Sequence, residues 1–139
     1  MPPTPVSEIK PTHERLRRTF DAGVTRVVSW RYAQLRGIER MMVENRGAFL
    51  EALHKDLRKP TFEGNIHEVE TVLSEVRFAM SHLASWMAPE AVTTPSLFLP
   101  ASSYIVKDPV GVVCIITAWN YPISAFGACC KHGFLSIDY

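Results

Sequence analysis

The sequence lacks several features that would assign it to a common functional class. No apolar run is long enough to cross a membrane, and the first residues have neither the basic end nor the apolar middle of a signal peptide. We therefore expect an intracellular, cytoplasmic protein without a membrane segment. The net charge is only +1 over 139 residues, which gives no general attraction to nucleic acid or to anionic lipid. The sequence also has no internal repeat, low-complexity tract or glycine-rich phosphate loop.

Cysteine is scarce, and its placement excludes two further classes. The three cysteines, Cys114, Cys129 and Cys130, are an odd number without the spacing of a disulfide framework, as is typical of a reducing compartment. Cys129 and Cys130 lie close to His132, but adjacent cysteines rarely reach one ion, and zinc needs further ligands at suitable spacing. We therefore predict no metal site.

Positive charge is concentrated in one stretch, where arginines recur between Arg15 and Arg40. They alternate with Glu14, Asp21 and Glu39, and no aromatic side chain is placed to stack on bases. A solvated helical face is favoured over a nucleic-acid surface, and no nucleic-acid partner is expected.

The first two thirds of the chain read as helical. Residues 1–11 are rich in proline and predict a flexible leader, followed by a helical part over residues 12–88. Thr12 is a candidate cap for the first helix. A second helix is expected over residues 25–45, and residues 46–57 continue it or form a third.

The most regular pattern predicts a long amphipathic helix over residues 64–87. Apolar residues recur there at alternating steps of three and four, widened by Val72, Ala79 and Trp86. The main stripe consists of Ile66, Val69, Leu73, Val76, Met80, Leu83 and Met87. A coiled coil is the alternative, but so wide a stripe favours a helix that packs within its own domain.

A β-ribbon and then a strand are expected after the helices. Within residues 89–108, the segments 91–94 and 102–107 have the character of a pair of short strands. Residues 110–117 are apolar and rich in β-branched types, as in a parallel strand buried on both faces. The fold class is therefore α/β, and the turn before Pro122 predicts the start of a β-turn-α unit.

Asn120 is the candidate functional residue, because it follows the carboxyl end of this strand, where ligands bind in open α/β sheets. Its uncharged amide can donate to an oxyanion that develops during attack on a carbonyl. The structural alternative is that Asn120 caps the helix that begins at Pro122. The spacing alone favours the cap.

Several motifs resemble the aldehyde dehydrogenase family, in particular its class 3, the fatty and medium-chain branch. The main match is Val-Gly-Val-Val at 110–113 followed by Ala-Trp-Asn-Tyr-Pro at 118–122. Supporting matches are Ser-Trp-Arg at 29–31, His-Lys-Asp-Leu-Arg-Lys at 54–59, Glu-Val-Glu at 68–70 and Tyr-Ile-Val-Lys-Asp-Pro at 104–109. The resemblance implies an amino-terminal fragment of this fold, in which residues 109–126 open an incomplete, Rossmann-like dinucleotide-binding sheet.

The resemblance also implies roles for residues. Asn120 falls on the family's oxyanion-stabilising asparagine, and Tyr121 falls near the aldehyde substrate. The residues expected against the cofactor, NAD or NADP, are Ile116, Thr117, Ala118 and Trp119. The ribbon would bridge subunits, which implies a homodimer or pairing with an intact subunit.

Two parts of the family pattern are missing. Neither the nucleophilic cysteine nor the glutamate base occurs in its family context. Residues 127–139 also depart from the family pattern, as expected for a truncated chain that is read through foreign sequence. Within them, Lys131 is not in the context of the family's ribose-binding lysine. A lone strand cannot form a sheet, so residues 110–139 are expected to be poorly packed in the isolated chain, or to be covered by another protein. The chain alone is expected to be inactive. The alternatives are a helical interaction module that pairs with an intact dehydrogenase subunit, and a truncated gene product.

Overall fold

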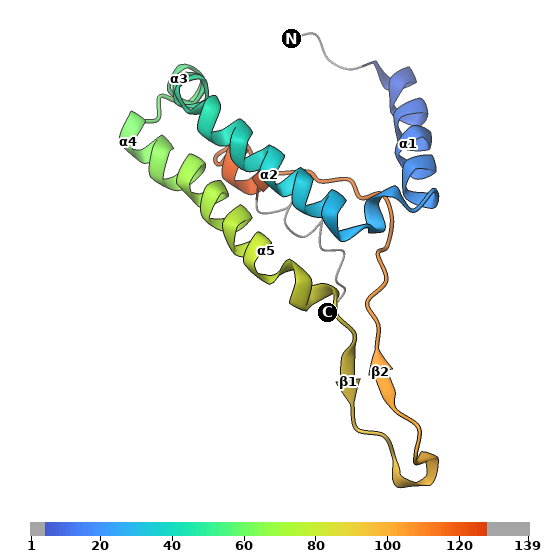
Figure 1. Ribbon diagram of the computed structural model, residues 1–139. Helices are drawn as coiled ribbons and strands as arrows, with labels where there is room; N and C mark the ends of the chain where they lie inside the picture. Colours follow the sequence, from blue (N-terminus) through green and yellow to red (C-terminus); the bar gives the residue numbers. More distant parts are fainter. Residues whose placement is uncertain (1–4, 128–139) are drawn as a thin grey trace.

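The computed structural model describes residues 5–127, and these form a helical layer with a projecting hairpin (Figure 1). The elements are α1 (Val6–Asp21), the 3₁₀ turn η1 (Val24–Arg26), α2 (Val28–Glu44), α3 (Arg46–Leu57), α4 (Thr61–Gly64), the π-type turn η2 (Asn65–Glu70), α5 (Thr71–Met87), β1 (Glu90–Val92), the 3₁₀ turn η3 (Ser96–Phe98) and β2 (Ser103–Ile105). A further short helix, without a label, covers residues 122–127. In the described part of the chain, no helix combines the length and the apolar character that a membrane crossing requires.

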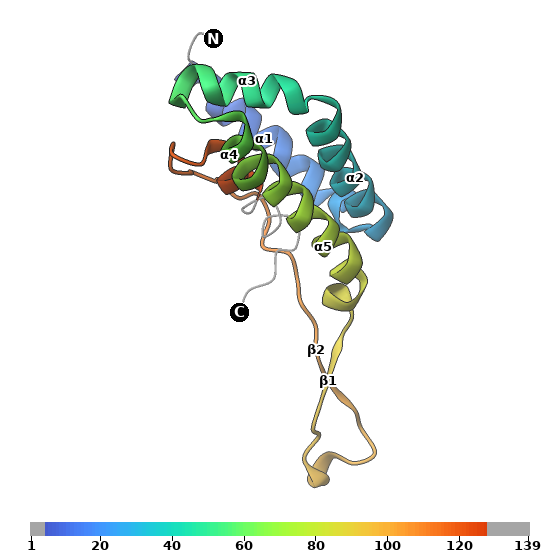
Figure 2. The same ribbon diagram turned by 90° about the vertical axis from the view of Figure 1, so that its left-hand side faces the viewer.

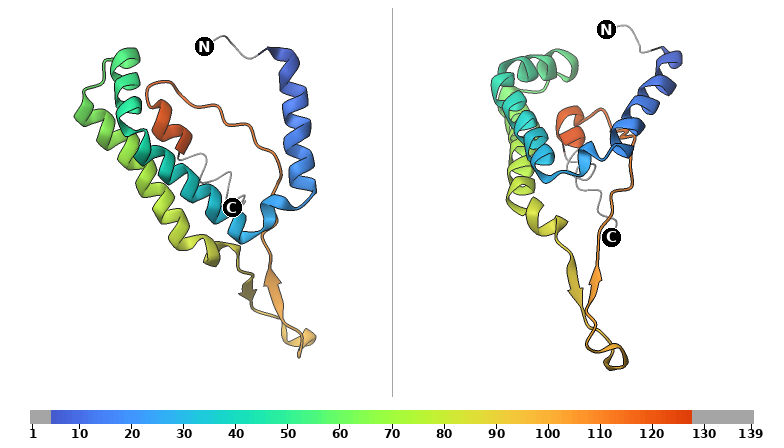
Figure 3. Two further views of the ribbon diagram at one scale, coloured as in Figure 1. Left: turned by 45° about the horizontal axis from the view of Figure 1, so that its top comes forward. Right: turned by 45° about the vertical axis from the view of Figure 1, so that its right-hand side comes forward.

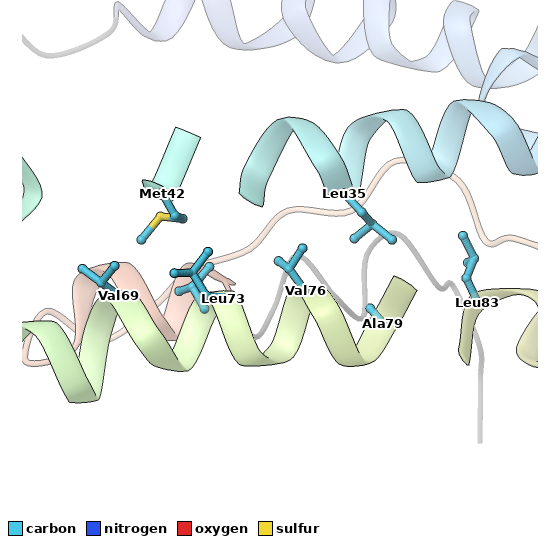
Figure 4. Close-up of a cluster of buried hydrophobic side chains, with 8 residues drawn as sticks. Leu35, Met42, Val69, Leu73, Val76, Ala79 and Leu83 are labelled. Atoms are coloured by element: carbon cyan, nitrogen blue, oxygen red, sulfur yellow. The ribbon is translucent and has the colours of Figure 1, made fainter. Parts of the chain in front are cut away.

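The core lies between α2 and α5, which run antiparallel side by side (Figure 1). Leu35 and Met42 of α2 point toward residues of η2 and α5 (Figure 4). The buried residues on that side are Val69, Val72, Leu73, Val76, Ala79 and Leu83. Their steps of three and four place them on one helical face, which confirms most of the predicted stripe and favours packing within the domain over a coiled coil. Ile66 is the exception, because its side chain is 41% exposed.

The predicted long helix is present as α4, η2 and α5 in continuous succession, and it begins at Thr61 rather than at residue 64. Pro60, in an extended conformation, stands immediately before it and cannot continue a preceding helix. The π-type turn at Asn65–Glu70 is one feature that periodicity did not predict. Such turns insert one extra residue per turn and change which side chains face the core.

The amino-terminal helix is longer than expected. Residues 6–11 belong to α1, whereas the sequence predicted a leader that ends at residue 11 and a helix that starts at Thr12. Pro5 is at the cap position, where its missing N–H costs nothing, so the helix can begin directly after the proline-rich start. Pro11 lies inside the helix, which continues despite the lost hydrogen bond. The helix ends at Asp21, and Gly23 then turns the chain with a φ of 75°.

The predicted ribbon is confirmed as an antiparallel pair. Glu90 of β1 pairs with Ile105 of β2, and Val92 pairs with Ser103. The hairpin projects away from the helical layer, as two views at right angles show (Figures 1 and 2). Its apolar side chains, among them Leu97, Phe98 and Ile105, are exposed to solvent.

Residues 110–117 run extended without forming a strand ladder within the described part of the chain. The expected burial of both faces is absent, since Val110, Val113 and Ile116 are all exposed. A strand needs at least one hydrogen-bonded neighbour, and the described residues supply none for this segment. The fold class is nevertheless confirmed as an α/β fragment that consists of helices and a two-stranded sheet.

Candidate functional site

The residues that the sequence singled out lie together on the extended segment and the turn that follows it. Ile116 is 92% exposed and Trp119 is 87% exposed, while Ala118 and Asn120 are also exposed and Thr117 is partly covered. Tyr121 is 40% exposed. The structure therefore places these side chains in one continuous stretch of surface rather than inside the helical core.

The beginning of this segment lies against the end of α1. Arg26 forms an ion pair with Asp108, with 3.3 Å between nitrogen and oxygen. Gly111 adopts a φ of 121°, and a Cβ atom there would lie 3.4 Å from Arg17 Nη1 and 3.8 Å from the ring of Phe20. Glycine at this position therefore lets the chain turn closely past α1. In Figure 3 the segment leaves the hairpin, passes α1 and follows the helical layer.

The end of the segment is fixed by a short helix over residues 122–127, whose start at Pro122 confirms the prediction. Its first backbone bond runs from the Ala125 N–H to the Tyr121 carbonyl, at 3.0 Å. The N–H groups of Ile123 and Ser124 donate to Oε2 of Glu68, at 3.0 and 2.8 Å. These are the amides that lack a partner inside any helix.

This arrangement corrects the capping interpretation of Asn120. The carboxylate of Glu68 takes the place of a local cap, although it is separated from the helix by more than fifty residues. Within the described residues, the Asn120 side chain forms no hydrogen bond, and it is exposed. Among the described residues, its amide therefore does not cap the helix.

Lys59 completes the contacts around Glu68. Its Nζ lies 2.5 Å from Glu68 Oε1, and the two side chains are 11% and 0% exposed. The same ammonium group lies 3.8 Å from the centre of the Tyr121 ring, in cation–π geometry. Arg58, with a φ of 56°, ends α3 in a left-handed conformation and turns the chain so that Lys59 can reach inward. One lysine thus contacts both Glu68 and the residue that follows Asn120.

The short helix also packs tightly on α5. Ile123 lies against the core cluster, and Ser124 and Gly127 are buried. A Cβ atom on Gly127 would lie 2.5 Å from Cγ2 of Val72, closer than real side chains approach. This part of the expected poorly packed region, residues 122–127, is therefore docked on the helices. Residues 128–139, with most of the predicted divergent tail and Lys131, lie outside the described residues.

Sequence reasoning missed Glu68 as a functional candidate, although a signal was present. Glu68 lies four residues before Val72, so it continues the buried stripe at a position where an apolar residue is expected. A carboxylate in such a position needs buried partners, because an unpaired buried charge is very costly. Its main-chain partners could not be found from spacing, since they lie far along the chain.

Other chemistry is limited in the described residues. They contain no group of three His, Cys, Asp or Glu side chains that could hold a metal ion. Cys114 is free and exposed on the extended segment, while Cys129, Cys130 and His132 lie outside the described residues. Arg31 is buried and donates from Nε to the Thr25 carbonyl at 2.9 Å. Burial, together with repulsion from Arg26, lowers the pKa of Arg31 below its ordinary value.

Comparison with known proteins gives consistent matches. The chain is 46% identical over 113 residues to aldehyde dehydrogenase family 3 comG of Dictyostelium discoideum, a match that covers 80% of this chain and 24% of that protein. It is 41% identical over 113 residues to aldehyde dehydrogenase family 3 member B1 of Homo sapiens, covering 81% of this chain and 24% of that protein. The chain thus spans about a quarter of the length of the curated relatives it matches.

Structure comparison agrees. The substrate-bound state of Staphylococcus aureus AldH superposes with a TM-score of 0.87 at 28% sequence identity, over 96% of this chain and 29% of that one. The described elements are therefore a fragment of that fold. The sequence model of the aldehyde dehydrogenase family matches residues 7–130, so the chain belongs to the aldehyde dehydrogenase family.

Proposed function

We propose that this chain supplies the oxyanion-binding turn for NAD- or NADP-dependent oxidation of aldehydes to carboxylic acids. The observation that carries the proposal is the placement of Asn120. Its amide is exposed and uncommitted among the described residues, at the end of an extended segment and two residues before a firmly docked helix. A donor held in this way can stabilise the charge that develops on a carbonyl oxygen under nucleophilic attack.

The neighbouring residues fit part of a dinucleotide. Ile116 and Trp119 present apolar surface that can lie against a flat ring, and Thr117 and Ala118 lie between them on the segment. When bound, the dinucleotide accepts the hydride that the aldehyde loses. The described residues include no glycine-rich loop for its phosphates, so phosphate-binding groups would have to come from other parts of a complete enzyme. Tyr121, held by Lys59, is proposed to lie near the aldehyde.

Catalysis also needs a thiolate nucleophile and a base that activates water, and no residue of this chain is assigned to either role. We therefore expect the 139-residue chain alone to have no turnover. The test mixes the purified chain with an aldehyde and NAD and follows NADH absorbance. Steady formation of NADH would contradict the expectation.

The role of Asn120 is tested in a grafted enzyme, in which residues 5–127 of this chain replace the matching segment of a complete aldehyde dehydrogenase family 3 protein. Asn120→Ala should lower kcat by about 10²- to 10³-fold, the usual cost of removing one oxyanion donor. The matched control is Asn45→Ala, because Asn45 is exposed at the end of α2 and its side chain bonds only to the Met41 carbonyl among the described residues. An unchanged kcat in Asn120→Ala would remove the role.

The hairpin supports a second proposal, an interaction with another subunit. Its exposed apolar side chains include Leu97 at 86% and Val106 at 71% exposure, a pattern typical of surfaces that bind another protein. The partner would be a second copy or an intact dehydrogenase subunit. Size-exclusion chromatography with light scattering separates the outcomes, since a monomer in the presence of an intact subunit would contradict pairing.

A further inference from the structure

Glu68 stands out because its fully buried carboxylate contacts two separate parts of the chain. Lys59 approaches from the loop before α4, at 2.5 Å, while the N–H groups of Ile123 and Ser124 approach from the helix beyond Asn120, at 3.0 and 2.8 Å. We propose that Glu68 is a positioning residue, which fixes the turn that carries Asn120 against the helical layer. This inference rests on the proposed role of Asn120.

Burial of the Glu68 carboxylate has an energetic cost. Placing a carboxylate at 0% exposure is unfavourable unless its charge is paired and its oxygens accept hydrogen bonds. Lys59 neutralises the charge through one oxygen, and the two amides share the other. Hydrogen bonds to a charged acceptor are stronger than neutral ones. Helix 122–127 is therefore held at one orientation, because only that orientation satisfies Glu68.

The geometry of η2 supports a dedicated role. Glu68 lies within the π-type turn at Asn65–Glu70, where an ordinary α-helical turn would have placed a different side chain toward the short helix. Thr71 bonds the Ile66 carbonyl through its hydroxyl at 3.1 Å, across the same wide turn. The π-type turn is therefore the local feature that directs the Glu68 side chain toward helix 122–127.

Asn120 lies so close to helix 122–127 along the chain that the position of the helix affects it. Asn120 precedes the helix by two residues, and Tyr121 between them is itself held by the Lys59 ammonium. A displacement of the helix start therefore moves the amide of Asn120. Catalytic donors must be held to within about 0.5 Å, so the loss of the Glu68 contacts should lower turnover without removing the donor.

The first arm of the test uses the complete 139-residue chain and amide hydrogen exchange. Glu68→Gln should speed exchange at Ile123 and Ser124 by about 10-fold, because charge-assisted bonds become neutral ones. The control is Glu70→Gln, which removes an ion pair with Arg46 from the same turn but touches no part of helix 122–127. Equal exchange at the two amides in wild type and Glu68→Gln would overturn the proposal, as would an equal effect of Glu70→Gln.

A second variant covers the case in which Glu68→Gln does not fold. The pair Lys59→Met with Glu68→Met replaces the buried ions by side chains of similar volume, a change that buried ion pairs often tolerate. We expect this variant to fold and still to exchange rapidly at Ile123 and Ser124. Slow exchange there would contradict positioning, because helix 122–127 would then be held in place without Glu68.

The second arm measures kinetics in the grafted enzyme. Glu68→Gln should lower kcat about 10-fold with an almost unchanged KM for NAD. In an Asn120→Ala background, Glu68→Gln should cause no further loss of kcat, because the effects of two residues are not additive when one acts through the other. An equal loss in both backgrounds, or no loss in either, would overturn the positioning role. Failure of the proposed function is distinct, because Asn120→Ala alone would then leave kcat unchanged.

Discussion

Gly127 offers the sharpest test of how the short helix packs on α5. In the structure, a Cβ atom at this position would lie 2.5 Å from Cγ2, 2.9 Å from Cγ1 and 3.1 Å from Cβ of Val72. Rotation of the valine side chain cannot remove the contact with its Cβ, and valine is stiff at χ1. Gly127→Ala must therefore move helix 122–127 away from α5.

The sign of the effect depends on two opposing terms. Overpacking costs about 1–3 kcal/mol, whereas alanine in place of glycine inside a helix gains at most about 1 kcal/mol. We expect a net loss of about 1–2 kcal/mol in the docking of the helix, which corresponds to about 5- to 30-fold faster opening at the Ile123 and Ser124 amides. Native-state hydrogen exchange measures this directly.

Gly47 provides the matched control, because nothing lies within 4 Å of a Cβ atom built there in α3. Gly47→Ala should raise the free energy of unfolding by up to about 1 kcal/mol. In a Val72→Ala background, Gly127→Ala should have a smaller effect, because the two methyl groups at 2.5 and 2.9 Å are gone and only the contact with Cβ at 3.1 Å remains. An unchanged exchange rate in Gly127→Ala, or the same effect in both backgrounds, would refute the reasoning.

Two further predictions concern the helical layer. Leu73→Ala, at 1% exposure between α2 and α5, should lower the free energy of unfolding by about 2–5 kcal/mol in urea denaturation, whereas Leu97→Ala on the hairpin, at 86% exposure, should change it by less than about 0.5 kcal/mol. Equal losses would contradict the assignment of the core. Arg58→Gly should raise the free energy of unfolding by about 0.5–1 kcal/mol, because glycine adopts the φ of 56° without strain. Arg58→Ala should give no such gain in the same thermal denaturation experiment.

The helical layer was predictable because its signal is local. The stripe from Val69 to Leu83 repeats at three and four residues, and the α2–α5 packing follows from it. The start of α1 was not predicted, since prolines before a helix resemble prolines in a loop until the structure shows that Pro5 occupies the cap position.

The site was predictable only in part. The position of Asn120 after an apolar, β-branched segment is a local pattern, and the start of the next helix at Pro122 followed from it. What holds that helix is a contact between Glu68 and amides far along the chain, which no periodicity encodes. The π-type turn at Asn65–Glu70 was likewise not predicted. Its effect is visible at Ile66, which the periodicity placed in the apolar stripe and which is 41% exposed.

The central claim is that residues 110–117 form the opening strand of a sheet whose other strands are not among the described residues 5–127. Hydrogen exchange at the amides of residues 112–117 tests it most directly, in the 139-residue chain and in the grafted enzyme. We expect near-intrinsic exchange in the chain alone and at least about 100-fold slower exchange in the grafted enzyme, where strand neighbours accept or donate the bonds. Strong protection in the monomeric chain, or no gain of protection in the grafted enzyme, would contradict the account.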